Sequence, residues 1–249
     1  MRLLLTGLSG TLAPRLAQAA AKRGWHVLGW DRSRVPPQDT AAAVAWLAHC
    51  RPEAIAHLAM GDVAWTALLA QHGAKNALPM VFTSTAMVFH HRPDGPHAVH
   101  DTRTAQDDYG RSKIAGEDAV LAFHPQASVA RIGWQIDADA QGNNMLAQLD
   151  AWQAREGCVA ASRVWRPACS FTADTAEALL DLIAAPVPGA VHLDSNGIEA
   201  HSFDAIVAAL QRQFERRGWV LRPNDDYRHD QRLVGGARHL PALSTRLAF

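Results

Sequence analysis

Tyr109 and Lys113 are the residues with the clearest chemical potential, because they stand four positions apart in the segment Tyr-Gly-Arg-Ser-Lys. On a helix, this spacing places the lysine ammonium beside the phenol. A free phenol has a pKa of about 10 and is a poor base at neutral pH, but a neighbouring cation stabilises the phenolate and lowers that pKa. The pair therefore predicts a general acid or base. The alternative is two solvent-facing side chains at a helix start.

Three consecutive hydroxyl side chains, Thr83, Ser84 and Thr85, stand within the apolar segment 81–89 that precedes the tyrosine. They come at the end of a predicted strand, Pro79–Thr83. A hydroxyl at this position can hold a substrate carbonyl while the tyrosine protonates it. Hydroxyl-rich strand ends also serve simply as hydrogen-bonding terminators, so this segment supports the tyrosine prediction without establishing it.

A glycine-containing turn, residues 7–13, lies between the predicted strand Arg2–Thr6 and the predicted helix Leu12–Arg23. Gly7 allows a tight turn, Gly10 lets the backbone approach a pyrophosphate, and the helix N-terminus offers N–H groups to phosphates. Glycines at strand–helix junctions are often only turns, but the place of this one at the first junction favours a dinucleotide site. The residues assigned to it are Gly7, Ser9, Gly10, Thr11 and Leu12.

Asp31 and Arg32 directly follow the second predicted strand, Trp25–Trp30. A carboxylate here can accept hydrogen bonds from the adenosine ribose and repel a 2′-phosphate, which favours NAD. The neighbouring guanidinium can instead hold a 2′-phosphate. We therefore predict NAD or NADP as cofactor with a slight preference for NAD, the alternative being two surface charges.

Short apolar strands alternate with helical stretches from the first residue, which predicts a parallel sheet covered on both faces. The predicted fold is α/β, a Rossmann-type doubly wound sheet with a small C-terminal substrate-binding lobe. We expect a single domain over 1–249, with 1–132 mainly dinucleotide-binding and 133–249 mainly substrate lobe. The other predicted strands are Ala54–Leu58, Ser128–Arg131 and Gly189–Leu193, and the other helices are Thr40–Cys50, Val63–His72, one from near Tyr109, Asn143–Arg155, Thr172–Ala184 and Phe203–Glu215. The tail from Pro223 has no clear periodicity.

The amino-acid composition limits the kinds of binding partner that are expected. The 249 residues carry 24 Lys+Arg and 24 Asp+Glu, so the formal net charge of +0 predicts neither nucleic-acid nor membrane binding. No uninterrupted apolar run approaches the roughly 20 residues of a membrane helix. Cys50, Cys158 and Cys169 form no C-x-x-C pair, which favours a reducing cytoplasm over a disulfide or zinc framework. Despite 13 histidines, no metal ligand set is predicted.

Seven motifs in order resemble the extended short-chain dehydrogenase/reductase superfamily, and most closely its dTDP-4-dehydrorhamnose reductase and sugar-nucleotide epimerase/dehydratase branches. The similarity covers about Met1 to Glu215. The motifs are TGLSGTLA, PEAIAHLAM, TSTAMVF, YGRSKIAGE, ARIGW, GNNM and SFTADTA.

The resemblance implies a role for individual residues. It implies Thr85 as the catalytic hydroxyl, Tyr109 as acid or base, and Lys113 as the group that lowers the tyrosine pKa and binds the nicotinamide ribose. It places Leu58, Ala59 and Met60 along the dinucleotide. Asn143 and Asn144 fall where the reductase branch closes over its substrate, although a helix cap with an ordinary polar neighbour explains them equally well.

Two departures from the family pattern bear on the substrate. Ala86-Met87 occupies the position at which the pattern of the rhamnose-type reductases has Asp-Tyr. A sugar 4,6-dehydratase would have an Asp-Glu pair there, and this sequence has none. The expected function is an NAD(P)-dependent oxidoreductase acting on a carbonyl or secondary alcohol of a nucleotide-sugar-like small molecule. The alternatives are an NAD-retaining sugar-nucleotide epimerase and a non-catalytic NAD(P)-binding regulatory protein. The resemblance also suggests a homodimer.

Overall fold

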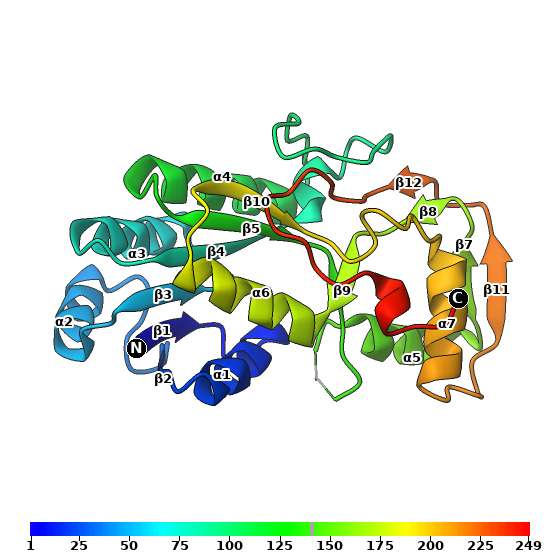
Figure 1. Cartoon of the computed structure of the whole chain (residues 1–249), viewed down its shortest axis with the longest axis horizontal. Helices are drawn as coiled ribbons and strands as arrows, with labels where there is room; N and C mark the ends of the chain where they lie inside the picture. Colours follow the sequence, from blue (N-terminus) through cyan, green and yellow to red (C-terminus); the bar gives the residue numbers. More distant parts are fainter. Residues whose placement is uncertain (140–141) are drawn as a thin grey trace.

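The computed structural model describes residues 1–139 and 142–249, and its centre is a six-stranded parallel sheet (Figure 1). The strands, in sheet order, are β10 (Gly189–Leu193), β5 (Ser128–Ile132), β4 (Met80–Thr85), β3 (Ala54–His57), β1 (Arg2–Thr6) and β2 (His26–Gly29). Strands β3, β4 and most of β5 are buried, as expected for strands covered on both faces. The predicted α/β fold class is confirmed.

Helices cover both faces of this sheet. Helices α1 (Leu12–Lys22) and α6 (Thr172–Ala184) share one apolar core with the sheet. Helices α2 (Thr40–Cys50), α3 (Val63–Lys75) and α4 (Asp108–Phe123) form a second core on the other face. Side-chain caps explain several helix starts, since Asp39 accepts from Ala42 N at 2.9 Å and Asp62 accepts from Ala64 N at 3.0 Å.

The chain reverses its direction of winding at β1, because β1 is flanked by β2 on one side and β3 on the other. Successive strands β3, β4, β5 and β10 then extend the sheet away from β2. A ligand crevice is expected beyond the carboxyl ends of the strands at such a switch point. The turn after β1 and the loop after β3 meet at this point.

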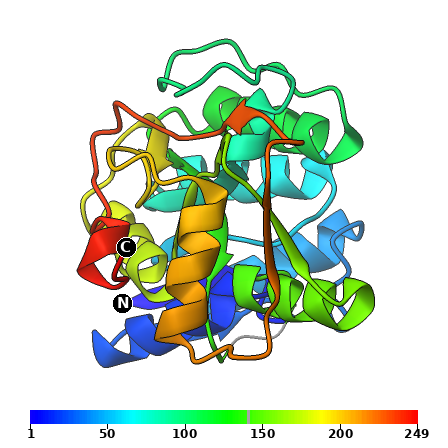
Figure 2. The same ribbon diagram turned by 90° about the vertical axis from the view of Figure 1, so that its right-hand side faces the viewer.

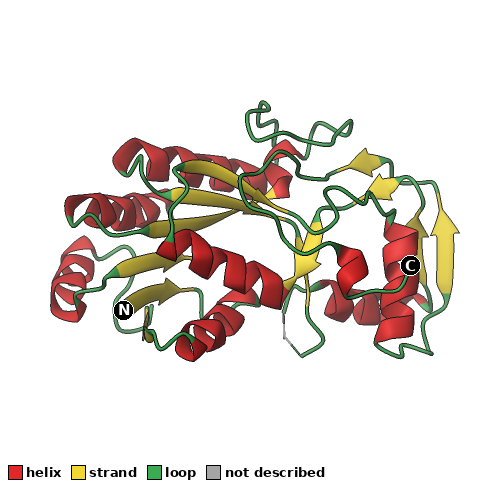
Figure 3. Ribbon diagram, in the orientation of Figure 1, coloured by secondary structure: helices red, strands yellow, loops and turns green. Residues whose placement is uncertain are grey.

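A second, smaller lobe lies beyond the carboxyl ends of the strands, on the right in Figure 1 and facing the viewer in Figure 2. It packs α5 (Met145–Glu156) and α7 (Phe203–Gln213) into a third apolar core. Figure 3 shows its short strands, which pair in parallel as β6 (Trp134–Ile136) with β9 (Cys169–Phe171), β7 (Val159–Ser162) with β11 (Leu221–Asn224), and β8 (Trp165–Arg166) with β12 (His229–Asp230).

The observed elements differ from the predicted ones mainly at their ends. Helix α5 begins at Met145 rather than Asn143, because the Asn144 side chain caps it by accepting from Ala147 N at 3.1 Å. Strand β4 runs to Thr85 rather than Thr83. The tail beyond Pro223 is more ordered than its sequence indicates, since it completes β11 and forms β12. No helix in residues 1–139 and 142–249 is long and apolar enough to cross a membrane.

Candidate active site

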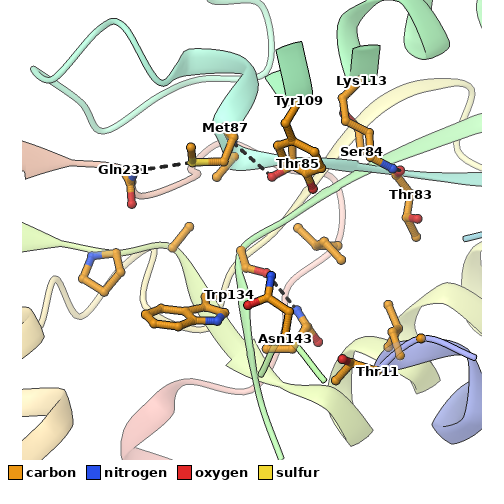
Figure 4. Close-up of a pocket in the computed structure, with 18 of the residues that line it drawn as sticks. Thr11, Thr83, Ser84, Thr85, Met87, Tyr109, Lys113, Trp134, Asn143 and Gln231 are labelled. Carbon is orange, nitrogen blue, oxygen red and sulfur yellow. Dashed lines mark hydrogen bonds between the residues drawn. The ribbon is translucent and has the colours of Figure 1, made fainter. Parts of the chain in front are cut away.

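A cavity of about 710 Å³ lies between the carboxyl edge of the sheet and the smaller lobe. Ten of the residues predicted for the site line it: Gly7, Gly10, Thr11, Leu12, Leu58, Met60, Thr85, Tyr109, Lys113 and Asn143. In Figure 4, Tyr109, Lys113 and Thr85 lie on one side of the cavity, and Trp134, Asn143 and Thr11 lie across it. The structure therefore brings the glycine turn and the tyrosine–lysine pair together in one site.

The turn after β1 is shaped for close approach of a ligand to backbone. Gly7 has φ +87°, and a Cβ there would lie 3.0 Å from Ala59 N. Gly10 N donates to Gly7 O at 2.8 Å and closes the turn. The first turn of α1 contains no acidic residue, so the positive end of the helix dipole faces the cavity uncompensated. These features fit the pyrophosphate of a dinucleotide.

Buried polar contacts hold the loop after β3 against this turn. Thr6 Oγ1 accepts hydrogen bonds from Leu58 N at 3.0 Å and Ala59 N at 3.1 Å. Thr6 also hydrogen-bonds His57 Nδ1 at 2.8 Å, and burial lowers the pKa of His57 to about 3, which keeps the imidazole neutral. Leu58 and Met60 line the cavity, whereas Ala59 is buried behind Gly7. Thr6 and His57 thus position the loop.

Asp31 and Arg32 do not line the cavity. The Asp31 carboxylate accepts from Ser33 Oγ at 2.7 Å and Ser33 N at 2.9 Å, and these bonds lower its pKa. The Arg32 guanidinium donates to Met60 O and lies 4.9 Å from the centre of the Trp65 ring. Both side chains therefore have protein partners beyond the edge of the cavity.

Two more predicted site residues lie outside the cavity lining. Ser9 is exposed at the turn, and Asn144 is fully buried as the cap of α5. Of the two asparagines, Asn143 is the one that reaches the cavity. No group of three or more His, Cys, Asp or Glu among residues 1–139 and 142–249 is arranged to hold a metal ion.

Tyr109 meets Thr85 at the start of α4. The phenol hydroxyl hydrogen-bonds the Thr85 side chain, and Thr85 Oγ1 also accepts from Met87 N at 3.2 Å in the 3-10 helix η1 (Ala86–Phe89). Gly110 makes this approach possible, because a Cβ there would lie 2.3 Å from Ala105 Cβ and 3.1 Å from Met87 O. The hydroxyl pair sits at the end of β4, where a substrate carbonyl can reach both oxygens.

Lys113 lies one turn further along α4 and is 6% exposed. Its Nζ donates to Thr83 O at 2.9 Å and lies 5.1 Å from the centre of the Phe82 ring. Burial lowers the pKa of Lys113 from 10.5 to about 8, against the opposing charge of Glu117. The ammonium is thus anchored to the end of the sheet beside the tyrosine.

The expected lowering of the tyrosine pKa is not what the structure shows. Burial of the phenol raises the pKa of Tyr109, the Asp107 carboxylate raises it further, and only the hydrogen bond from Thr85 opposes them. Lys113 does not lower this pKa, because the lysine, with a pKa of about 8, loses its own charge before the phenol ionises. Tyr109 and Lys113 stand one turn apart on α4, but desolvation opposes ionisation of the phenol.

A buried ionic cluster fixes α4 on the sheet, and sequence reasoning gave it no role. Glu117 is 1% exposed and accepts from Arg131 Nε at 2.9 Å, from Arg131 Nη2 at 2.8 Å and from Ser84 Oγ at 2.5 Å. Arg103 Nη1 donates to its second oxygen at 3.1 Å. The glutamate and Arg131 both stood in the motifs quoted above. Because Ser84 neighbours Thr85 and Glu117 is one turn from Lys113, the cluster sets the spacing of the candidate catalytic residues.

A glycine turn at a parallel-sheet switch point, together with a helix that carries tyrosine and lysine to the same cavity, defines the extended short-chain dehydrogenase/reductase class. Similarity to known proteins narrows this class. The sequence profile described as "RmlD substrate binding domain" matches residues 62–219, and the chain belongs to this family, that of the dTDP-4-dehydrorhamnose reductases.

Individual relatives agree with this assignment. A dTDP-4-dehydrorhamnose reductase of Mycobacterium tuberculosis is 31% identical over 99% of this chain and 95% of its own length. Among solved structures, dTDP-4-dehydrorhamnose reductase of Bacillus anthracis in complex with NADP superposes with a TM-score of 0.82 at 16% identity, covering 98% of this chain and 96% of that one. An enzyme of Bordetella bronchiseptica in complex with NAD+ has a TM-score of 0.76 at 19% identity, with 94% and 88% covered. The solved structures show the shared fold.

Proposed function

We propose that the chain is an NAD(P)-dependent sugar-nucleotide reductase that reduces a ketone of a nucleotide-linked sugar to a secondary alcohol. The observation that carries the proposal is the convergence of Thr85, Tyr109, Lys113 and the Gly7–Leu12 turn on one cavity. The named activity of the Mycobacterium tuberculosis relative supports a dTDP-linked 4-keto sugar as the substrate.

Each group of site residues has its own role in the proposed reaction. The backbone of Gly7–Leu12 and the N-terminus of α1 bind the pyrophosphate of NAD(P)H, which, when bound, supplies a hydride to the carbonyl carbon. Thr85 donates a hydrogen bond to the carbonyl oxygen and Tyr109 transfers its phenolic proton to the same oxygen. Solvent then reprotonates the tyrosine. Lys113, anchored at Thr83 O, binds the cofactor ribose and compensates the phenolate charge formed during transfer.

The protonation state of the phenol is compatible with the reductive direction. A tyrosine whose pKa is raised by burial is protonated at neutral pH and therefore acts as a proton donor. Oxidation of an alcohol needs the phenolate, which the same burial disfavours. The site as built therefore supports reduction.

A preference for NADH over NADPH rests on the loop after β2. Asp31 is held in place by Ser33 and is available to ribose hydroxyls, while its charge repels a 2′-phosphate. Arg32 is engaged by Met60 O and the Trp65 ring, which keeps it from a 2′-phosphate. This arrangement supports NAD as the preferred form.

The direct test is the consumption of NADH or NADPH with dTDP-4-dehydrorhamnose, followed at the nicotinamide absorbance band. Tyr109→Phe is expected to lower kcat roughly 100- to 10,000-fold with little change in the affinity for NAD(P)H. Full activity of this variant contradicts the assigned acid, and failure of the wild type to bind either dinucleotide contradicts the function itself.

A non-catalytic NAD(P)-binding subunit is the second candidate. It is favoured by Ala86-Met87 at the position discussed above and by a relative from Xenopus tropicalis named methionine adenosyltransferase 2 subunit beta, 26% identical over 62% of this chain and 57% of its own length. Dinucleotide binding without turnover on a panel of sugar-nucleotide ketones distinguishes it. An epimerase would instead keep its dinucleotide through purification and turn over with no net absorbance change.

A further inference from the structure

The chain contains 2 tyrosines, and both line the same cavity. Tyr109 comes from α4 of the Rossmann part, whereas Tyr227 comes from the tail segment that leads into β12. Tyr227 is 41% exposed, although its ring packs edge-on against Trp165 with centroids 5.2 Å apart. Part of this ring is therefore held by the smaller lobe and part is available to a ligand.

A buried histidine fixes the hydroxyl of Tyr227. The phenol oxygen lies 2.8 Å from His229 Nδ1, and His229 is 2% exposed. The other ring nitrogen, Nε2, is buried without a hydrogen-bond partner among the described residues. Burying an imidazole with one nitrogen unpaired costs free energy, so the contact that its other nitrogen makes with Tyr227 is a feature of the site to be explained. Besides Tyr227, the imidazole interacts with the Arg92 backbone and lies against the His90 ring, with centroids 5.8 Å apart.

The surrounding contacts keep this pair at the cavity. Strand β12 pairs with β8 so that His229 stands opposite Trp165, and Ser162 Oγ donates to Tyr227 O at 2.7 Å. Two residues on, Gln231 accepts from Trp165 Nε1 at 2.8 Å and its amide nitrogen lies 3.8 Å from Met87 Sδ. Figure 4 shows this last contact, which joins the tail to the turn that follows Thr85.

We propose that Tyr227 is a substrate-binding residue that hydrogen-bonds a hydroxyl of the sugar ring, and that His229 is the positioning residue that orients it. The inference rests on the function proposed above, and it assigns the part of the cavity opposite the glycine turn to the sugar ring. Tyr227 and Tyr109 then hold the same sugar from the two lobes, one for binding and one for proton transfer.

A sugar hydroxyl suits this pair because it both donates and accepts. Burial, with the charges of His90 and His97, lowers the pKa of His229 to about 4, so the imidazole is neutral and carries one N–H. With that hydrogen on Nδ1, the imidazole donates to Tyr227 and the phenol hydrogen is left for the ligand. With it on Nε2, the phenol donates to Nδ1 and keeps lone pairs for a ligand hydroxyl. The Tyr227–His229 pair can therefore donate a hydrogen bond to a sugar hydroxyl or accept one from it without a change of charge.

The test compares two tyrosine variants by steady-state kinetics with dTDP-4-dehydrorhamnose at saturating dinucleotide. Tyr227→Phe keeps the ring against Trp165 and is expected to raise KM roughly 3- to 10-fold, the effect of one lost neutral hydrogen bond, with kcat changed less than about 3-fold. Tyr109→Phe is expected to act on kcat instead. Arg228→Gln, an exposed neighbour, is the matched control and should leave KM unchanged. An unchanged KM in Tyr227→Phe overturns the inference.

A double-variant cycle separates positioning from simple support of the fold. His229→Asn should raise KM in the wild-type background and have no further effect in the Tyr227→Phe background, because its effect passes through the phenol. Equal effects in both backgrounds overturn the role of His229. Binding gives an independent readout by calorimetry: Tyr227→Phe should weaken dTDP-rhamnose several-fold and leave dTDP unchanged. Equal weakening of both overturns the sugar contact, and a wild type that binds neither overturns the proposed function as well.

Discussion

Replacing Lys113 by Met is expected to stabilise the folded chain at neutral pH, although it should abolish activity. The lysine is 6% exposed, and burial lowers its pKa from 10.5 to about 8. A buried ammonium that has lost hydration without gaining a full counter-charge costs folding free energy. Methionine has a similar length and carries no charge, so the variant removes this cost.

The expected gain in stability of the Lys113→Met variant follows from the lowered pKa of Lys113. A difference between 10.5 and about 8, at about 1.4 kcal/mol per pKa unit, is a penalty of roughly 3 kcal/mol on the charged form. The variant also loses the hydrogen bond from Nζ to Thr83 O, which contributes about 1 kcal/mol. At pH 7 the variant should therefore be more stable than the wild type by about 2 kcal/mol.

The sign of the pH dependence is fixed by proton counting. Between the folded pKa of about 8 and the unfolded value of 10.5, the unfolded wild type binds more protons than the folded one. Its free energy of unfolding therefore rises with pH across this window. Below about pH 8 both states are protonated and the whole penalty is present. Near pH 10.5 the penalty has gone, and the variant should be the less stable protein by about 1 kcal/mol, the lost hydrogen bond.

Urea unfolding at pH 7 and pH 10.5 checks this reversal, because the difference between variant and wild type cancels the titration of all other groups. Lys75→Met, at an exposed position of α3, is the matched control and should show a small, nearly constant difference. A Lys113→Met variant that is less stable at pH 7, or whose difference from wild type is the same at both pH values, would refute the reasoning.

Three further perturbations test the positioning of the site. Glu117→Gln leaves Arg131 buried without its counter-charge and should lower the free energy of unfolding by about 3 kcal/mol in urea titrations. The control Asp118→Asn, on the exposed side of the same helix, should change this free energy by less than about 1 kcal/mol. Equal losses in the two variants contradict the role of the buried cluster. Gly7→Ala forces a Cβ to within 3.0 Å of Ala59 N at φ +87°. The Kd for NADH, measured by fluorescence titration, should therefore rise about 10-fold or more, while the far-UV circular dichroism stays unchanged. An unchanged Kd argues against a phosphate-binding role for this turn. Asp31→Ala should raise the affinity for NADPH relative to NADH by about 10-fold, and an unaltered ratio would remove Asp31 from cofactor selection.

The parallel sheet and the site residues at its carboxyl edge could be predicted, because the sequence patterns that indicate them are short-range. Strand and helix alternation fixes the parallel sheet, and the helices Thr40–Cys50 and Thr172–Ala184 were predicted with the bounds observed. Residues Gly7 and Gly10 act through their own backbone geometry, and Tyr109 and Lys113 are joined by one helical turn. Short-range spacing carries all of this information.

What could not be predicted depends on contacts between distant segments. Glu117 meets Arg131 only when α4 packs on β5, and Gln231 reaches Met87 across 144 positions of sequence. The pairing of Tyr227 with His229 is local, but its importance comes from β12 lying beside β8, which no periodicity in the tail indicates. Desolvation of Tyr109 is likewise a property of the assembled cavity.

Burial acts on the two central residues in opposite directions and so decides what the site does. It raises the pKa of the Tyr109 phenol above 10.0 and lowers that of the Lys113 ammonium to about 8, which moves the two values apart and disfavours a preformed phenolate–ammonium pair. The resting site thus holds a neutral phenol beside a cation that is already bonded to Thr83 O. Once the phenol gives up its proton to a carbonyl oxygen, the new phenolate and the Lys113 ammonium, which line the same cavity, attract each other. The attraction appears only as the proton leaves, so it favours the transfer over the resting state, which is the condition for catalysis of reduction.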